Sequence, residues 1–284
     1  MSGRLSSEGH NSARLAARRR QRRRRILVSL CILLLLLFGG TLYELNQSAV
    51  RISRVTVYGA DQSLADRAIV AMQGTYLGII PRDSTFFFPA SRIRTDIIST
   101  HPNIAAVSLF RNGLTGLSIK VNDRVAIARW CGASEGKSDF KSESPKSDFF
   151  SDANCYVFDA SGYIYAAAST TTETINSFAL YAHLVGDTLE PLRATLVHAD
   201  QLPSTFDFAR QLDTLGGSVA QIILRDDEVD DILTSGTRIT YVLGHEQDAF
   251  TALVSARENM NLTDGSLEYI DLRFDGKVYI KKRI

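Results

Sequence analysis

The chain has 284 residues, of which 45% are hydrophobic and 22% are charged, and these are ordinary values for a globular protein. The formal net charge is +1, but residues 1–25 hold nine arginines and one glutamate, so this segment carries +8 and the rest of the chain carries −7. Such an acidic main body argues against nucleic acid as its partner.

A basic segment followed by an apolar run dominates the start of the chain. Residues 18–25 read RRRQRRRR, and residues 26–43 contain no charged side chain. As a helix rising about 1.5 Å per residue, this run covers about 27 Å, close to the ~30 Å hydrocarbon core of a bilayer. The pattern predicts a transmembrane helix at 26–43, with Tyr43 at the membrane interface.

The arginines predict the orientation of this helix. Positive charge beside a span stays on the cytoplasmic side, so residues 1–25 are expected to form a disordered cytoplasmic tail that contacts lipid headgroups. Everything after about Glu44 then lies outside the cytoplasmic membrane. The alternative is a cleaved signal peptide, although no small-residue cleavage site follows Gly40 and the apolar run is longer than such peptides usually have.

Residues 51–122 have the pattern of a small domain with the order strand, helix, helix, strand, strand. Its elements are expected at 51–59, 63–74, 89–102, 104–111 and 117–121. Ser63 is expected to cap the first helix, whose apolar face would consist of Leu64, Ala68, Ile69 and Met72. The three phenylalanines at 86–88 are expected to pack in the core or entry loop of this domain, the alternative being an exposed contact patch.

Residues 123–284 predict a β-rich second domain with two helices. The strands are expected at 126–130, 155–158, 178–184, 192–197, 219–224, 230–233, 238–243, 267–272 and 277–281, with the helices near 204–215 and 246–259. An insert at 132–154 is rich in Ser, Lys and Asp and is expected to be a mobile loop. With the first domain and the span, the fold class is α+β.

Two cysteines bracket the insert. Cys131 and Cys155 would stand at the neck of the hairpin formed by 126–130 and 155–158, where a disulfide would close the loop. We hypothesise that this disulfide forms. The alternative is two unpaired thiols whose Cα atoms are too far apart to bridge. The third cysteine, Cys31, lies in the apolar run and is expected to be inert.

The sequence contains no recognisable catalytic constellation, metal site or cofactor-binding motif. The five histidines have no ligand spacing, and there is no phosphate-binding loop or nucleophile elbow. The acidic cluster at 226–231 lacks the glycine and the spacing of a calcium loop, so a solvated turn is expected there. The protein is therefore expected to act by binding and to be no enzyme.

Several short segments, in order and at matching spacing, resemble one family. They are Val55-Thr56-Val57-Tyr58-Gly59, His101-Pro102-Asn103-Ile104, Ile119-Lys120-Val121-Asn122-Asp123-Arg124, Ala128-Arg129-Trp130, Tyr156-Val157-Phe158-Asp159-Ala160-Ser161-Gly162 and Tyr269-Ile270-Asp271-Leu272-Arg273-Phe274. Together with the Arg-flanked span, they resemble the FtsQ/DivIB family of cell-division proteins. The resemblance implies a POTRA domain at 51–122 and an FtsQ-type β domain at 123–284.

The resemblance also implies a function and a docking site. The family consists of membrane scaffolds of the bacterial divisome, which recruit partner proteins during septum formation, and the end of its β domain binds FtsB-like and FtsL-like proteins. Carried over by position, the docking surface would comprise Phe274, Lys277, Val278, Tyr279, Ile280, Lys281 and Lys282. An open edge strand there would accept a partner strand, and the lysines would suit an acidic partner.

Other interpretations of the same residues stay open. The last strand would offer no docking edge if it were central in its sheet or capped. A membrane-anchored envelope enzyme with an unrecognised site is a rival function, as is a POTRA-type assembly chaperone. The chaperone would require several POTRA repeats or a long series of barrel strands, and the sequence has neither.

Overall fold

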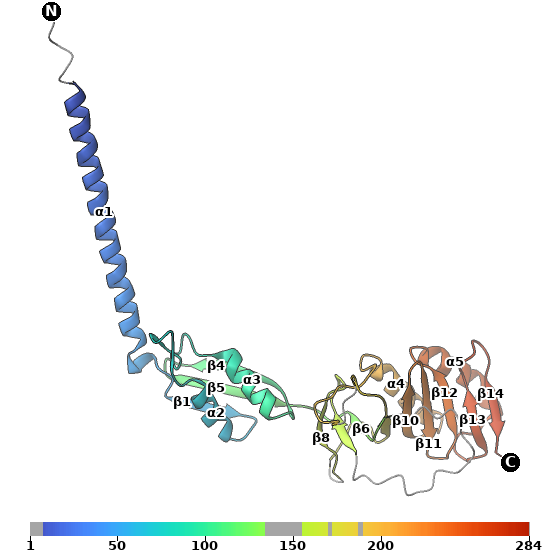
Figure 1. Ribbon diagram of the computed structural model, residues 1–284. Coiled ribbons are helices and arrows are strands. Elements are labelled where there is room, and N and C mark those ends of the chain that lie inside the picture. The colour runs from blue at the N-terminus through green and yellow to red at the C-terminus, as the bar shows by residue number, and fades with distance from the viewer. Residues whose placement is uncertain (1–7, 134–154, 170–171, 187–189, 284) are drawn as a thin grey trace, which may run out of the picture. The chain divides into compact units, whose positions relative to one another are not determined.

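The structure is a computed structural model that describes residues 8–133, 155–169, 172–186 and 190–283, with side chains from residue 21 onward except that of Asn259. It is a mixed α/β protein that divides into two compact units. The first unit contains residues 1–100 and 106–122, and the second contains residues 101–105 and 123–284. Figure 1 labels their helices and strands.

The first helix, α1, is continuous from Glu8 to Leu45. Its segment Gln21–Leu45 is the one helix among the described residues that is long and apolar enough to cross a membrane, and none of it is buried in the protein. The arginine-rich segment is helical from Glu8 onward, where its composition predicted a disordered tail. Arginine, alanine and leucine favour helix, and extending a helix that the apolar run has already nucleated costs little.

The rest of the first unit consists of a three-stranded sheet, two helices and a short hairpin. The helices are α2 (Ser63–Ala71) and α3 (Ala90–Thr100), and the strands are β1 (Arg54–Tyr58), β2 (Thr75–Tyr76), β3 (Ile80–Pro81), β4 (Ile104–Asn112) and β5 (Gly116–Asp123). The sheet has the order β1-β5-β4, with β1 parallel to β5, and β2 pairs with β3. The predicted strand-helix-helix-strand-strand order is present, and the hairpin is an addition to it.

Helices α2 and α3 contact each other and bury an apolar face. Leu64, Ala68 and Met72 from the first and Ile93 and Ile97 from the second are at most 3% exposed. They lie in one core with Leu117, Ile119 and Val121, whose spacing of two along β5 places them on one face of the sheet.

Two predicted details of α2 are wrong. Ile69 is 45% exposed, because a nine-residue helix that covers a narrow sheet buries only one stripe. Ser63 does not cap the helix with its hydroxyl. Instead Asp61 accepts the backbone N–H of Ser63 at 3.2 Å, so a carboxylate that lies two residues earlier satisfies this amide.

The described residues of the second unit form one nine-stranded sheet and two α-helices. Its strands are β6 (Ala128–Trp130), β7 (Tyr156–Phe158), β8 (Ile164–Ala167), β9 (Ala179–Tyr181), β10 (Val219–Arg225), β11 (Glu228–Leu233), β12 (Arg238–Val242), β13 (Leu267–Asp271) and β14 (Tyr279–Lys282). Its helices are α4 (Leu202–Thr214) and α5 (Glu246–Ala256), the latter extended by a short 3₁₀ turn. The strand order is β14-β13-β12-β11-β10-β9-β6-β7-β8 (Figure 1).

Helices α4 and α5 contact each other and pack on β10 and β12 respectively. The core between helices and sheet contains Phe208 and Tyr241, whose ring centroids lie 4.3 Å apart. The only tryptophan of the chain, Trp130, is buried at the other end of this core and donates its indole N–H to the carbonyl of Ala182 at 2.8 Å.

One expected strand of this unit is absent. Residues 192–197 make only isolated bridges, from Thr195 to Tyr163 and from Leu196 to Leu184. Arg193 and His198 adopt left-handed backbone conformations, with φ of 72° and 57°, and these interrupt an extended ladder. The segment nevertheless has a structural role, because it covers one edge of the sheet.

Candidate protein-docking site

Strand β14 lies at one end of the nine-stranded sheet. It pairs antiparallel with β13, with Tyr279 opposite Asp271 and Ile280 opposite Ile270. In the part of the chain that the structure describes, no strand pairs with the other side of β14. The strand is Tyr279–Lys282, so it begins two residues later than predicted, and Lys277 belongs to the preceding turn, in which its N–H binds the carbonyl of Phe274 at 3.0 Å.

The outer side of β14 presents backbone hydrogen-bonding groups. Arg283, directly after the strand, donates its N–H inward to the carbonyl of Ser266 at 2.8 Å. Backbone groups alternate between the two sides of a strand, so Tyr279 and Lys281 also face β13. Ile280 and Lys282 therefore direct their N–H and C=O groups outward, which is the template that an added strand requires.

The two faces of β14 differ. Val278 and Ile280 are partly buried and pack against the apolar core. On the opposite face, Tyr279 meets Phe274 edge to face, with ring centroids 5.3 Å apart and about half of each side chain exposed. A strand added at this edge would extend the core on one face and would meet an aromatic pair on the other.

Arg273 fastens the turn before β14 to the sheet. Its guanidinium binds Asp271 at 2.7 Å and Glu228 of β11 at 2.6 Å. Burial opposes ionisation of Asp271, but the hydrogen bonds from Arg273 outweigh it and hold the pKa of this carboxyl below its ordinary value. The hydrogen bonds that Arg273 donates to the two carboxylates raise the pKa of its own guanidinium. Position 273 was part of the family resemblance, but this ion-pair role was not predicted.

The lysines of the site are not equivalent. Lys281 makes an ion pair with Glu268 at 2.9 Å and lies 5.8 Å from the ring centre of Tyr269. Lys277 and Lys282 are exposed and form no ion pair with any residue that the structure describes. These two are therefore the better placed to meet an acidic partner.

The opposite edge of the sheet is covered by the chain itself. Ile164 of β8 donates its N–H to Ala194 at 2.9 Å and accepts the N–H of Arg193 at 2.8 Å. Leu196 donates to the carbonyl of Gly162 at 2.9 Å. The segment around 193–196 thus occupies the outer hydrogen-bonding positions at the start of β8.

Cys131 and Cys155 are joined by a disulfide, with their Cα atoms 4.2 Å apart. They lie beside the paired strands β6 and β7, at the neck of the hairpin. Residues 134–154, and with them nearly all of the insert that was expected to be a mobile loop, lie outside the described residues.

The acidic cluster is a solvated turn only in part. Asp226 and Asp227 are exposed, whereas Asp230 and Asp231 are at most 1% exposed because they fall on opposite faces of β11. Asp230 makes an ion pair with Arg225 and accepts the hydroxyl of Thr240 at 2.6 Å. The expectation of a solvated turn is wrong for the last two, because Asp231 lies on the core face of β11 and Asp230, on the other face, is enclosed by its partners Arg225 and Thr240.

Asp231 lies in the core beside Tyr241. Burial raises the pKa of the Asp231 carboxyl well above its ordinary value, the negative charge of Asp230 adds to this, and Glu246 contributes in the same direction. Burial likewise raises the pKa of the Tyr241 hydroxyl. Burial among apolar side chains therefore favours the neutral, protonated form of this carboxyl.

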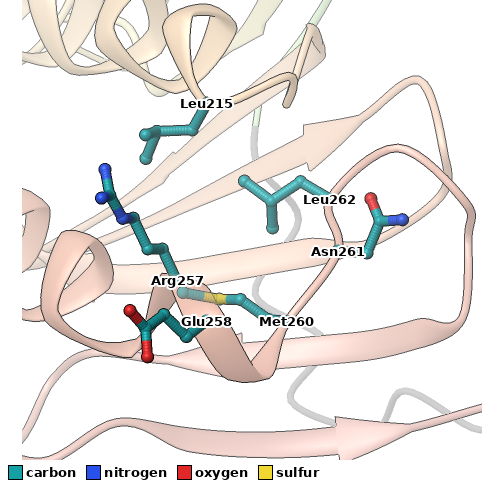
Figure 2. Close-up of a pocket in the computed structure, with 6 residues that line it drawn as sticks. All are labelled: Leu215, Arg257, Glu258, Met260, Asn261 and Leu262. Carbon is teal, nitrogen blue, oxygen red and sulfur yellow. The ribbon is translucent and has the colours of Figure 1, made fainter.

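Hollows lined by described residues of the second unit include two of different size. The larger, about 350 Å³, is lined by Leu215, Arg257, Glu258, Met260, Asn261 and Leu262 (Figure 2). The smaller, about 160 Å³, brings His183 and His198 together with Asp226, a grouping that sequence spacing did not reveal. Within the described residues, no group of three His, Cys, Asp or Glu side chains is arranged to hold a metal ion.

Compared with known proteins, the sequence matches no protein-family model and no curated protein. The family resemblance therefore rests on the short segments named above and on the order of the elements.

Proposed function

We propose that this chain is a single-pass scaffold of the bacterial divisome, with an N-terminal cytoplasmic tail, a POTRA domain and an FtsQ-type β domain outside the membrane. Its β domain would bind FtsB-like and FtsL-like proteins and so couple partners during septum formation. It would act by binding, without catalysis or a cofactor. The observation that carries the proposal is the open edge of β14, at the position where the family resemblance implies the docking surface.

Three further features support it. The order strand, helix, helix, strand, strand directly after an apolar helix is the arrangement expected for a POTRA domain behind a span. The arginines before the span favour a cytoplasmic N-terminus. A disulfide between Cys131 and Cys155 suits an oxidising compartment outside the cytoplasm.

The test is a binding measurement with the full chain in nanodiscs and the FtsB-like and FtsL-like proteins of the same host. Lys282→Pro removes the outward N–H of β14 and places a ring where a partner strand would lie. Each ladder hydrogen bond contributes about 1 kcal/mol, so with this steric clash we expect affinity to fall at least about tenfold. Lys282→Ala keeps the N–H and removes only the charge, and it should weaken binding a few-fold.

The outcomes separate the site from the function. Equal affinity for the wild type and Lys282→Pro would refute β14 as the docking strand. Absence of binding by a folded wild type, with folding checked by the fluorescence of Trp130, would refute the divisome assignment. Equal losses in the proline and alanine variants would mean that charge, and not strand addition, holds the partner.

A further inference from the structure

We infer that an apolar surface at one end of the first unit docks on the bilayer from which α1 emerges. The surface, called the apolar tip below, consists of side chains from three loops: Leu77, Ile79, Phe86, Phe87 and Leu114. The inference rests on the proposed membrane span and is independent of partner binding. Its occupant would be the interfacial layer of lipid headgroups and upper acyl chains.

The apolar tip is exposed to an unusual degree. Leu77 is 96% exposed, and Ile79, Phe86, Phe87 and Leu114 are each about half exposed. Apolar side chains scattered singly on a surface need no explanation, but a group in adjoining loops marks an interaction site. The loops at 75–81, 84–89 and 112–115 contain no charged residue. The expectation that the phenylalanines pack inside the domain is therefore wrong for the first two of the three.

Hydrogen bonds hold two of these loops, 84–89 and 112–115, together, and the loop at 75–81 leads into the first of them through residues 82–83. The buried Thr85 donates its N–H to the carbonyl of Val50 at 3.0 Å, and its hydroxyl to the carbonyl of Leu114. Arg111, at the end of β4, places its guanidinium carbon 5.9 Å from the ring centre of Phe86. The loop that carries the phenylalanines is thus fixed to the turn that carries Leu114 and to the segment just after α1.

That segment lies close to the membrane. Val50 lies five positions after Leu45, the end of α1, and the intervening turns and 3₁₀ helix advance about 2 Å per residue, or roughly 10 Å in all. The headgroup layer itself extends about 5–8 Å beyond the hydrocarbon on each side. Strand β3 also contacts α1, and Figure 1 shows the connection between α2 and α3 beside the end of that helix. Loops bonded to Val50 therefore begin at the headgroups.

Backbone strain at Leu77 supports an external contact. Its φ of 50° lies in the left-handed region, where glycine or asparagine is the usual residue, and Gly78 follows with φ of 74°. A leucine that is almost fully exposed gains nothing from the described chain in return for this conformation. A strained residue that its own fold does not require points to a role outside that fold.

The charges around the apolar tip fit lipid. Arg51, Arg82 and Arg111 surround it, and the guanidinium carbon of Arg82 lies 5.1 Å from the ring centre of Tyr76. The neighbouring acid, Asp83, is paired with Arg51 at 2.7 Å. Exposed apolar and aromatic side chains with arginines at their margin are the composition of segments that lie in the membrane interface.

The test places an environment-sensitive fluorophore on single cysteines of the full chain in nanodiscs that contain anionic lipid. The free Cys31 is first replaced by serine, and the disulfide-bonded cysteines do not react. Leu77→Cys and Phe87→Cys probe the apolar tip, and Tyr43→Cys is the positive control. The matched control is Tyr58→Cys, a position about as exposed as Phe87 that lies at the far end of β1 from the tip.

We expect the label at 77 and at 87 to show blue-shifted emission and quenching by lipids that carry a spin label near the headgroup, and the label at 58 to show neither. Emission and quenching at 77 and 87 equal to those at 58 would overturn the inference. A blue shift without quenching by lipid would assign the tip to a protein surface instead, and would also overturn it. Failure of the label at 43 to be quenched would refute the span itself, so that the two failures are distinguishable.

Discussion

The two edge strands of the nine-stranded sheet, β8 and β14, differ in whether their outer backbone groups are hydrogen-bonded within the described chain. At β8, residues 193–196 fold back and bond to Ile164 and Gly162, so the outer backbone groups at the start of this strand are occupied. At β14, the outer N–H and C=O groups of Ile280 and Lys282 meet no other strand among the described residues. The covered edge lies beside the disulfide, whereas the open edge is held by the ion pairs of Arg273.

The difference shows how an edge is kept available without inviting unwanted pairing. Edge strands are hazards that proteins usually cover, shorten or charge. The β8 edge is covered. The β14 edge is only four residues long, carries Lys281 and Lys282, and contains a register shift in its pairing with β13. Such an edge resists self-association and still accepts a strand of matching shape and charge, as the proposed docking requires.

The largest effect on stability is expected from breaking the disulfide, which lies in the half of the sheet that ends at the covered edge, β6 to β8. Cys131→Ser releases a loop of 24 residues and should lower the free energy of unfolding of the second unit by about 3 kcal/mol. Denaturation of the full chain in micelles, followed by the fluorescence of Trp130, measures this loss. Hydrogen exchange should quicken more in β6, β7 and β8 than in β13 and β14.

The matched control for this prediction is Cys31→Ser, which removes a free thiol from the apolar helix and should leave the second unit unchanged. An equal loss of protection in both halves of the sheet would contradict the comparison, because the disulfide would then stabilise the sheet as a whole.

Local patterns in the sequence predicted the open edge better than the covered one. The turn at Asp275-Gly276 and the alternation of Val278, Tyr279 and Ile280 were sufficient to place a last strand there, and Gly276 does adopt a left-handed φ of 65°. The cover at β8 depends on contacts between residues some 30 positions apart. Its apolar composition predicted a strand of its own instead of a segment that bonds to an edge.

Which side chains are buried was the other feature that the sequence did not predict correctly. Neighbouring carboxyls at Asp230 and Asp231 suggest exposure to solvent, but one is buried by its own polar partners and the other by the apolar core. Apolar residues at Ile69, Phe86 and Phe87 suggest a core, but the small first unit has no space for them. Composition reports what a side chain prefers, and only the tertiary arrangement decides whether that preference is met.

A smaller effect on stability, one that depends on pH, is expected from Asp231, which lies on β11 in the half of the sheet that ends at β14. Its folded pKa is raised above the ordinary 3.8, chiefly by burial, so the folded state binds this proton more tightly than the unfolded state. Below about pH 3.8 the carboxyl is neutral in both states, so the free energy of unfolding carries no penalty from this group. As the pH rises from there through the folded pKa, that free energy falls. Asp231→Asn has no proton to lose, and its stability relative to wild type should increase as the pH rises from about 3.8 through the folded pKa of Asp231.

Denaturation across this pH range measures the slope, and Asp226→Asn serves as the control because it makes the same carboxyl-to-amide change at an exposed position on the same hairpin. A constant difference between Asp231→Asn and wild type at every pH would show that the carboxyl is not neutral in the fold. Alkaline pH should also quicken hydrogen exchange in β11 and β12 before β7 and β8.

The smallest effect on global stability is expected from removing the ion pairs of Arg273 that hold the open edge in place. Arg273→Gln keeps a planar hydrogen-bonding group but loses the ion pairs with Asp271 and Glu228, both of which are partly exposed, so the cost to global stability should be about 1 kcal/mol. The consequence should be local, because these pairs join the turn before β14 to β11. Exchange of the β14 amides should therefore quicken while that of β8 stays unchanged, and partner affinity should fall through a faster dissociation rate. Arg193→Gln, beside the covered edge, is the matched control. If both variants altered β14 alike, the ion pairs of Arg273 would have no special part in keeping that edge in place.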